Sequence, residues 1–265
     1  MRLATATYPA TTVARDVRGA VYVEFLLVFL PVFLLFLCIL ELGFLYTGRL
    51  VAQHAATRAA RAAVVILDDD PAFYGGEARD SIDTNGTSIS DSAIEAFMDG
   101  AGFGGTATRP AGAPRFSDIR SAASIPLLSV APSDEQLSTA LGEGDSVRNA
   151  IGLGPGRATS GAEAYNEAAM AVTFPTAPAA NSFRTTFERD DLITVRVTYL
   201  MHCSVPLVPV LMCHEPADLD LEPEESAQMN LGFLSSRPNP RYHVVRAEAT
   251  LRNQGAAYLY PSETP

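Results

Sequence analysis

A long apolar stretch near the N-terminus constrains this chain more than any other feature. Between Ala20 and Tyr46 only Glu24 and Glu41 interrupt the hydrophobic residues. About twenty residues of helix cross the ~30 Å hydrocarbon core of a bilayer. We therefore expect a transmembrane helix, with everything that follows it on one side of the membrane.

The flanks of this helix favour one orientation. Arginines lie on both sides of it, so counting charges near the helix does not decide, and long domains barely obey the positive-inside rule. The tail before the helix is short and basic, whereas the part after it is long and acidic. We expect the N-terminus in the cytoplasm and the residues after about Arg49 outside.

Composition and motifs exclude several classes of function. The net charge is -11, and every basic residue is an arginine. An acidic domain argues against nucleic-acid binding, because phosphate contacts need clustered cations. The chain has no G-x-S-x-G and no H-E-x-x-H motif. We predict no catalytic residue and no cofactor, and a membrane-tethered hydrolase ranks last among the functions considered.

The N-terminus does not fit an ordinary secretory signal peptide. Such peptides have an apolar region of about 7–15 residues, followed directly by a small-x-small cleavage site. Here the apolar run is longer and ends in ELGFLYTGRL, without such a site. A short polar leader that ends at Arg18-Gly19 instead indicates cleavage before the helix, which leaves the anchor in the mature protein.

The sequence around this point resembles a known family. Gly19, Ala20-Val21-Tyr22-Val23 and Glu24-Phe25 before a long apolar helix resemble the processing site of type IV pilin-like proteins. The wider segment 18–66 is similar to the TadE/TadG-like pseudopilins of the tight-adherence (Flp) pilus system. The resemblance implies a bacterial inner-membrane protein that prepilin peptidase cuts between Gly19 and Ala20. It also implies that the helix packs among other pilin subunits.

Glu24 is an acid just inside the apolar run, beside Phe25. An ionised acid at mid-bilayer costs about 2.5–3.5 kcal/mol on insertion scales. Cleavage after Gly19 would create a positive amine about 7 Å along the helix, and that amine, or one from a neighbouring subunit, would neutralise Glu24. Alternatively, Glu24 simply reaches the interface. Glu41 has no evident partner, and we expect it at the other interface.

Two further features of the helix affect its packing. Pro31 removes a helical hydrogen bond and predicts a kink, either a pilin-like bend or a tolerated kink in a lone anchor. Beyond the span, small residues recur at three- and four-residue steps and form a narrow smooth face. This face fits the protein's own domain or another subunit's helix; it comprises Ala52, Ala55, Ala56, Ala59, Ala63 and Ile66.

The exported part is expected to be α+β. Residues 192–201 and 242–252 alternate between apolar and polar, which predicts two half-buried strands in a small antiparallel sheet. The chain then divides into a leader (1–19), a long helix (20–67), a Gly/Pro-rich insertion with short helices (68–190) and a strand region (191–265). One helix of the insertion is expected from Ser160 to Val172.

Cys203 and Cys213 lie between the two strands, each beside a histidine. A disulfide is the favoured reading in an oxidising compartment. A zinc site formed with His202 and His214 is the alternative, although the spacing fits no common zinc pattern. The function that accounts for these features is a TadE-like minor pilin or pseudopilin. The alternative is an unprocessed bitopic membrane protein whose exported domain binds a ligand or partner.

Overall fold

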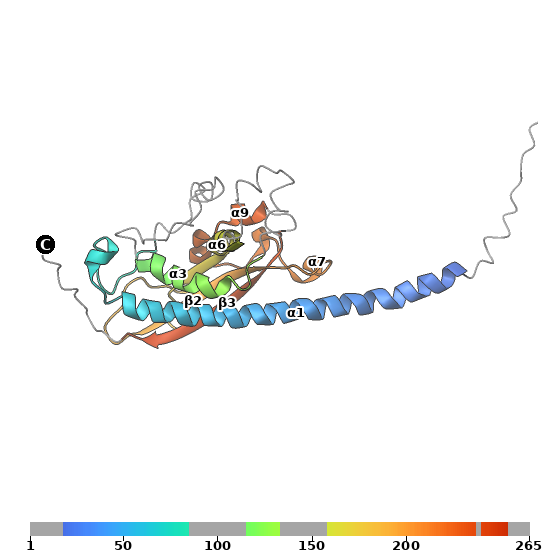
Figure 1. The fold of residues 1–265 in the computed structure, drawn as a ribbon. Helices are drawn as coiled ribbons and strands as arrows, with labels where there is room; N and C mark the ends of the chain where they lie inside the picture. The colour runs from blue at the N-terminus through green and yellow to red at the C-terminus, as the bar shows by residue number, and fades with distance from the viewer. Residues whose placement is uncertain (1–17, 85–114, 133–157, 237–239, 254–265) are drawn as a thin grey trace, which may run out of the picture.

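The fold is organised around one long helix. The computed structural model describes residues 18–84, 115–132, 158–236 and 240–253. Helix α1, Arg18–Ile66, has 49 residues. Figure 1 shows its N-terminal half projecting away from the domain, while its C-terminal half runs along it. This continuity follows from the sequence, because residues 49–67 contain no Gly or Pro and are rich in alanine.

A three-stranded antiparallel sheet in the order β1-β2-β3 forms the centre of the domain. The strands are β1 (Met170–Thr173), β2 (Leu192–His202) and β3 (Tyr242–Arg252). β2 and β3 pair along their whole length, from Leu192 opposite Arg252 to His202 opposite Tyr242. The predicted antiparallel pairing and the α+β class are confirmed.

The prediction that β2 is half-buried is wrong. Its polar residues Thr194, Arg196 and Thr198 are at most 4% exposed. The polar face can be buried because each of these groups has a partner. Thr194 Oγ1 lies 3.0 Å from Thr250 Oγ1 on the neighbouring strand. Thr198 donates a 2.6 Å hydrogen bond to Glu225 Oε1.

The middle region contributes more to the domain than its Gly/Pro-rich sequence indicates. The helix expected from Ser160 to Val172 is α6 (Ala158–Ala169), and the chain then becomes β1 at Met170, because the edge of β2 offers pairing partners. Helix α3 (Arg115–Leu127) is a further element that the sequence did not reveal. The short helices are η2 (Pro71–Tyr74), α7 (Pro209–Met212), η4 (Pro216–Asp218), α8 (Pro223–Gln228) and α9 (Leu231–Ser235).

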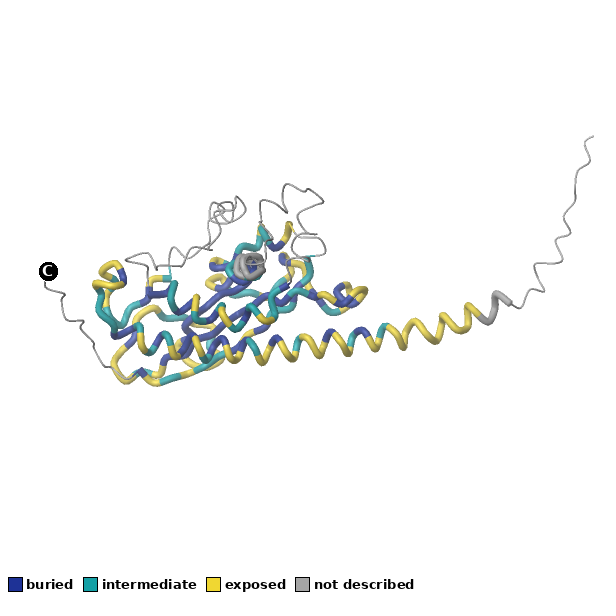
Figure 2. The backbone as a smooth tube through the Cα atoms, in the orientation of Figure 1, coloured by how far each residue is buried: buried dark blue, intermediate teal, exposed yellow. Residues whose placement is uncertain are grey.

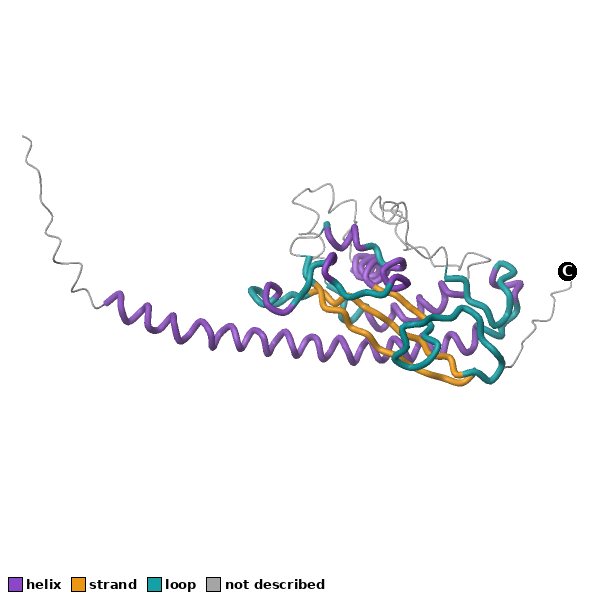
Figure 3. The backbone as a smooth tube through the Cα atoms, turned by 180° about the vertical axis from the view of Figure 1, so that it is seen from behind, coloured by secondary structure: helices purple, strands orange, loops and turns teal. Residues whose placement is uncertain are grey.

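The main core lies between α1, α3 and the sheet. α1 contacts α3, β2 and β3, and Figure 3 shows the strands running beside its C-terminal half. Buried alanines of α1 meet Phe116 and Ile119 of α3 and apolar residues of β2 such as Val195 and Val197. The domain is therefore built directly on the second half of the helix that carries the apolar stretch.

Candidate functional site

The N-terminal half of α1 is an exposed apolar rod. Figure 2 shows this half almost entirely exposed, apart from a few buried positions. The large hydrophobic side chains left uncovered extend from Tyr22 to Leu50. In the described part of the chain, α1 is the one helix long and apolar enough to cross a membrane. So much exposed apolar surface is unfavourable in water, and it suits single-pass anchoring in a membrane.

The predicted processing and assembly residues lie at the start of this rod. The backbone of Gly19 and Ala20 belongs to the first turn of α1, and Glu24 and Phe25 are exposed one turn later. Phe25 stacks on Phe29 with ring centroids 5.3 Å apart, and Phe29 stacks on Phe33. One side of the rod therefore carries a ridge of stacked aromatic rings directly after Glu24.

Pro31 lies inside α1, which continues through it as helix. Figure 1 shows the N-terminal half curving gently over its length. A proline removes one hydrogen bond and obstructs another carbonyl in the preceding turn, so this is the position at which further bending would cost least. A sharper kink at Pro31 on assembly stays a prediction.

Glu41 differs from the expectation of an interfacial acid without a partner. It is 1% exposed, because the segment between Cys203 and Cys213 covers it. The Val205 N–H donates a 3.3 Å hydrogen bond to Glu41 Oε2. Beside it, Leu37 packs with Val205 and Val208 in a small separate cluster. The second acid of the apolar stretch therefore attaches the domain to the anchor.

Cys203 and Cys213 form the disulfide that the sequence favoured. The zinc alternative would need their thiolates together with His202 and His214. The ligand atoms that do come together, within 4.8 Å, belong to Glu41, Cys203, Cys213 and His243. The disulfide occupies both sulfurs of that group, so its remaining donors are one carboxylate and one imidazole. His214 is exposed and lies outside the group.

The alanine face of α1 packs on the protein's own domain. Ala52, Ala55, Ala56, Ala59 and Ala63 have no exposed surface, and they belong to the same buried core as β2 and α3. Ile66 is partly buried at the edge of this core. The sequence allowed this face to pack either on the protein's own domain or on another subunit's helix. In the structure it packs on the protein's own domain.

Arg115 stabilises the end of α1, a role that no pattern in the sequence predicted. Its guanidinium donates to the carbonyl of Ile66 and, at 3.0 Å, to that of Asp69. It also stacks over the ring of Tyr74 at 4.4 Å. The last carbonyls of a helix lack intrahelical donors, and Arg115 supplies one to Ile66, the last residue of α1. Burial lowers the pKa of the Arg115 guanidinium, and the charge of nearby Glu77 opposes that shift.

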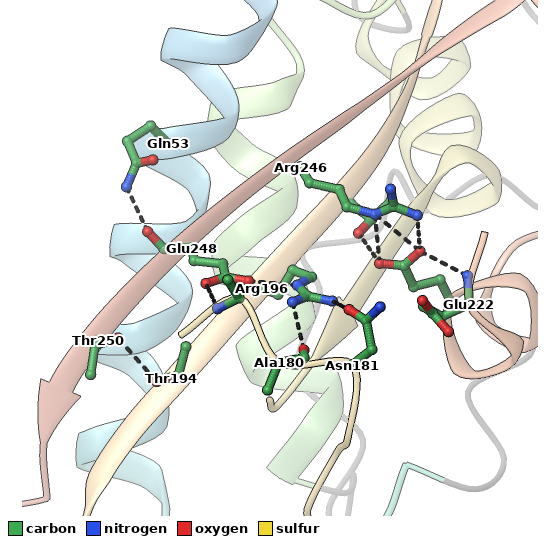
Figure 4. A network of polar contacts seen from close by, with 12 residues as sticks. Gln53, Ala180, Asn181, Thr194, Arg196, Glu222, Arg246, Glu248 and Thr250 are labelled. Atoms are coloured by element: carbon green, nitrogen blue, oxygen red, sulfur yellow. Dashed lines mark hydrogen bonds and ion pairs between the residues drawn. The ribbon is translucent and has the colours of Figure 1, made fainter. Parts of the chain in front are cut away.

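A polar network lies on the face of β2 and β3 that carries the side chains of Arg196, Arg246 and Glu248 (Figure 4). Arg196 pairs with Glu248 at 2.7 Å, and Arg246 pairs with Glu225 at 2.8 Å. Gln53 of α1 donates to the backbone carbonyl of Glu248 at 2.7 Å. A hollow of about 450 Å³ beside the network has Arg49, Arg196, Arg246 and Glu248 in its lining. Its arginines Arg196 and Arg246 are neutralised by carboxylates, and the arrangement joins α1 to the sheet.

These features define a protein that carries a small α+β domain on one long, partly apolar helix. The family model described as TadE-like protein matches residues 19–61. The match starts at the glycine of the predicted processing site and ends within the alanine face, in agreement with the resemblance of the sequence. No curated protein and no solved structure matches the chain.

Proposed function

We propose that this protein is a TadE-like minor pilin or pseudopilin, a structural component of a pilus assembly or secretion apparatus. One observation carries the proposal: the TadE-like match at residues 19–61 coincides with α1, an exposed apolar helix that has Gly19 in its first turn and an acid at Glu24. A structural role in a filament requires a helix surface that other subunits can contact. The N-terminal half of α1 supplies one.

Prepilin peptidase is the proposed processing enzyme, and the bond between Gly19 and Ala20 is the proposed site. Cleavage there removes residues 1–19 and creates a positive amine at Ala20. Glu24 follows four residues later, about one turn along a helix. The amine of the same chain or of a neighbouring subunit neutralises the Glu24 carboxylate, which is the step that makes burial of the helix among other helices favourable.

The partners follow from the anchor. Residues 20–67 form the helix that contacts inner-membrane lipid first and other pilin or pseudopilin subunits later. The N-terminus lies in the cytoplasm, and the part after the helix lies in the periplasm or outside the cell. This exported part comprises the region 68–190 and the strand region 191–265, whose folded elements pack on the second half of α1.

An unprocessed bitopic membrane protein is the second candidate, and one observation favours it. The alanine face packs on the protein's own domain, and the disulfide loop covers Leu37 and Glu41. The domain therefore covers part of the α1 surface that other subunits would otherwise contact. In this case the exported domain binds a ligand or partner, and the leader stays attached.

Substitution of Glu24 tests the proposed role in assembly. Glu24→Ala and Glu24→Gln leave the amine without its carboxylate, while Val23→Ala is the matched control on the same turn. We expect normal membrane insertion of all three proteins. Neutralising a charge that costs about 2.5–3.5 kcal/mol supports assembly, so co-purification with pilin subunits should fall about tenfold or more for both Glu24 variants. Co-purification equal to that of the control would contradict the role.

A further inference from the structure

The loop closed by the Cys203–Cys213 disulfide ends in an exposed apolar tip. Its sequence from Ser204 to Met212 is SVPLVPVLM, without a charged residue. Leu207, Val210 and Leu211 are 62%, 69% and 60% exposed. Figure 1 shows helix α7, which belongs to this tip, at the edge of the domain nearest the projecting half of α1.

The loop lies along the apolar stretch of α1. Val205 and Val208 pack on Leu37, and Cys38 is packed against the same cluster. Leu37 precedes Arg49, the first cation after the stretch, by twelve residues, which is about 18 Å of helix. The main core of the domain reaches α1 only from about Leu45 onward. Among the described residues, the disulfide loop thus contacts α1 closer to its N-terminus than the main core does.

We propose that this tip inserts into the membrane leaflet on the domain's side, beside α1. Two of its exposed side chains belong to α7 and the third precedes it, and α1 leaves Phe36, Ile39 and Leu40 uncovered next to Leu37, where the loop touches the helix. Lipid is the occupant of both surfaces, because the loop meets α1 within its apolar stretch. This inference rests on membrane anchoring and does not depend on cleavage at Gly19.

Several backbone groups of the loop have partners within the protein, as an environment without water favours. Polar backbone groups in lipid need partners within the protein. The Val205 N–H donates to Glu41, and the N–H groups of Leu211 and Met212 both donate to the Val208 carbonyl. Pro206 and Pro209 have no N–H to satisfy. The N–H of Cys213 donates to the Pro209 carbonyl at 3.1 Å, which closes the α7 turn.

The base of the loop is polar, which sets the depth of the tip. Arg241 and Glu215 form a 3.0 Å ion pair next to Cys213, and His214 is exposed there. Such groups belong at the level of the headgroups. The apolar face of an interfacial amphipathic helix lies about 5–10 Å into the boundary between headgroups and acyl chains, and we expect a similar depth for this tip. The tip therefore contacts the upper part of the acyl chains and fixes how the domain is oriented on the membrane.

Single tryptophans test this directly, because the chain contains none. The full protein with Leu211→Trp is reconstituted in phospholipid vesicles, and its fluorescence is measured with lipids brominated at different depths of the acyl chain. Phe36→Trp on the exposed part of α1 is the control within the membrane. Phe73→Trp, on η2 at the far end of the domain, is the control in water.

We expect L211W to show a blue-shifted emission maximum and to lose intensity with brominated lipids. The loss should be larger with bromines near the headgroup than with bromines near the chain end. F73W should lose none. The inference is overturned if L211W is quenched by iodide in the same way as F73W. It is equally overturned if L211W is protected from iodide but untouched by brominated lipids, because a second copy or another protein would then cover the tip.

Discussion

Glu225 shows how single polar residues hold the α+β domain together. Its carboxylate has no exposed surface, and it accepts hydrogen bonds from Arg246 and Thr198 and from the N–H of Glu222. Burial alone raises the pKa of Glu225, but these hydrogen bonds outweigh it, so the pKa lies below its ordinary value. The folded protein therefore prefers the ionised form more strongly than the unfolded chain does.

The sign of the pH dependence follows from this shift. A depressed pKa contributes stability that is fully present above the unfolded value of about 4.3 and is lost as the pH falls through the folded value. Glu225→Gln should lower the free energy of unfolding at neutral pH by about 2 kcal/mol, since it removes hydrogen bonds to a charged group. Denaturant unfolding measured from pH 7 to pH 3 should show a weaker acid dependence in this variant.

Glu224→Gln is the matched control, because Glu224 is an exposed acid one residue earlier in the same helix. Its unfolding free energy and acid dependence should stay close to those of the original protein. If E225Q and E224Q behave alike, Glu225 does not stabilise the fold in the way described.

At the scale of elements, Gly48 of α1 lies directly against the side chain of Met201 in β2. A Cβ on Gly48 would overlap Met201 Sδ of β2, whereas a Cβ on Gly43, five residues earlier, meets nothing. Gly48→Val should therefore displace the Met201 side chain and destabilise the domain by about 1 kcal/mol, the low end of the usual cost of overpacking. Gly43→Val carries the same change in helix propensity and should leave the stability of the domain unchanged. Thermal unfolding of the purified protein in nanodiscs measures both.

Equal melting temperatures for the two variants would contradict this packing. A lower melting temperature for G43V alone would instead mean that the contact that matters lies near Gly43, in the apolar stretch of α1.

The sequence was sufficient for elements whose pattern is local. α1 follows from its hydrophobic run and its alanines, and β2 and β3 follow from strict alternation, because each pattern is repeated several times along the element. α3 could not be predicted, since its buried residues include Arg115 and Arg120, which look like surface residues. Both cations are buried because they donate to backbone carbonyls at 2.8–3.0 Å, those of Asp69 and Met170.

The candidate site was predictable to a similar degree. Gly19, Glu24 and the cysteine pair are visible in the sequence because their spacing alone carries the signal. The burial of Glu41 was not, because its partner Val205 is 164 residues away and contributes only a backbone N–H. Because every residue except proline has a backbone N–H, the residue type at position 205 does not reveal this contact.

At the scale of the whole molecule, the domain is attached to its anchor at two levels. The alanine face and the Gln53 contact bind the second half of α1 to the sheet, and the disulfide loop binds the domain again at Leu37 and Glu41. The projecting part of the helix, from the start of α1 to about Leu35, is left for lipid or for other helices. The domain and the helix are therefore joined at two separate places along α1.

The central claim is that this helix belongs to a processed pilin-like subunit, and the start of the mature protein tests it most directly. The protein is expressed in a host with a functional prepilin peptidase, extracted from the membrane and analysed by intact mass and N-terminal sequencing. A chain that begins at Ala20 is the predicted result, and Gly19→Leu should block the cut. A chain that retains Met1 or the leader in that host would contradict the account.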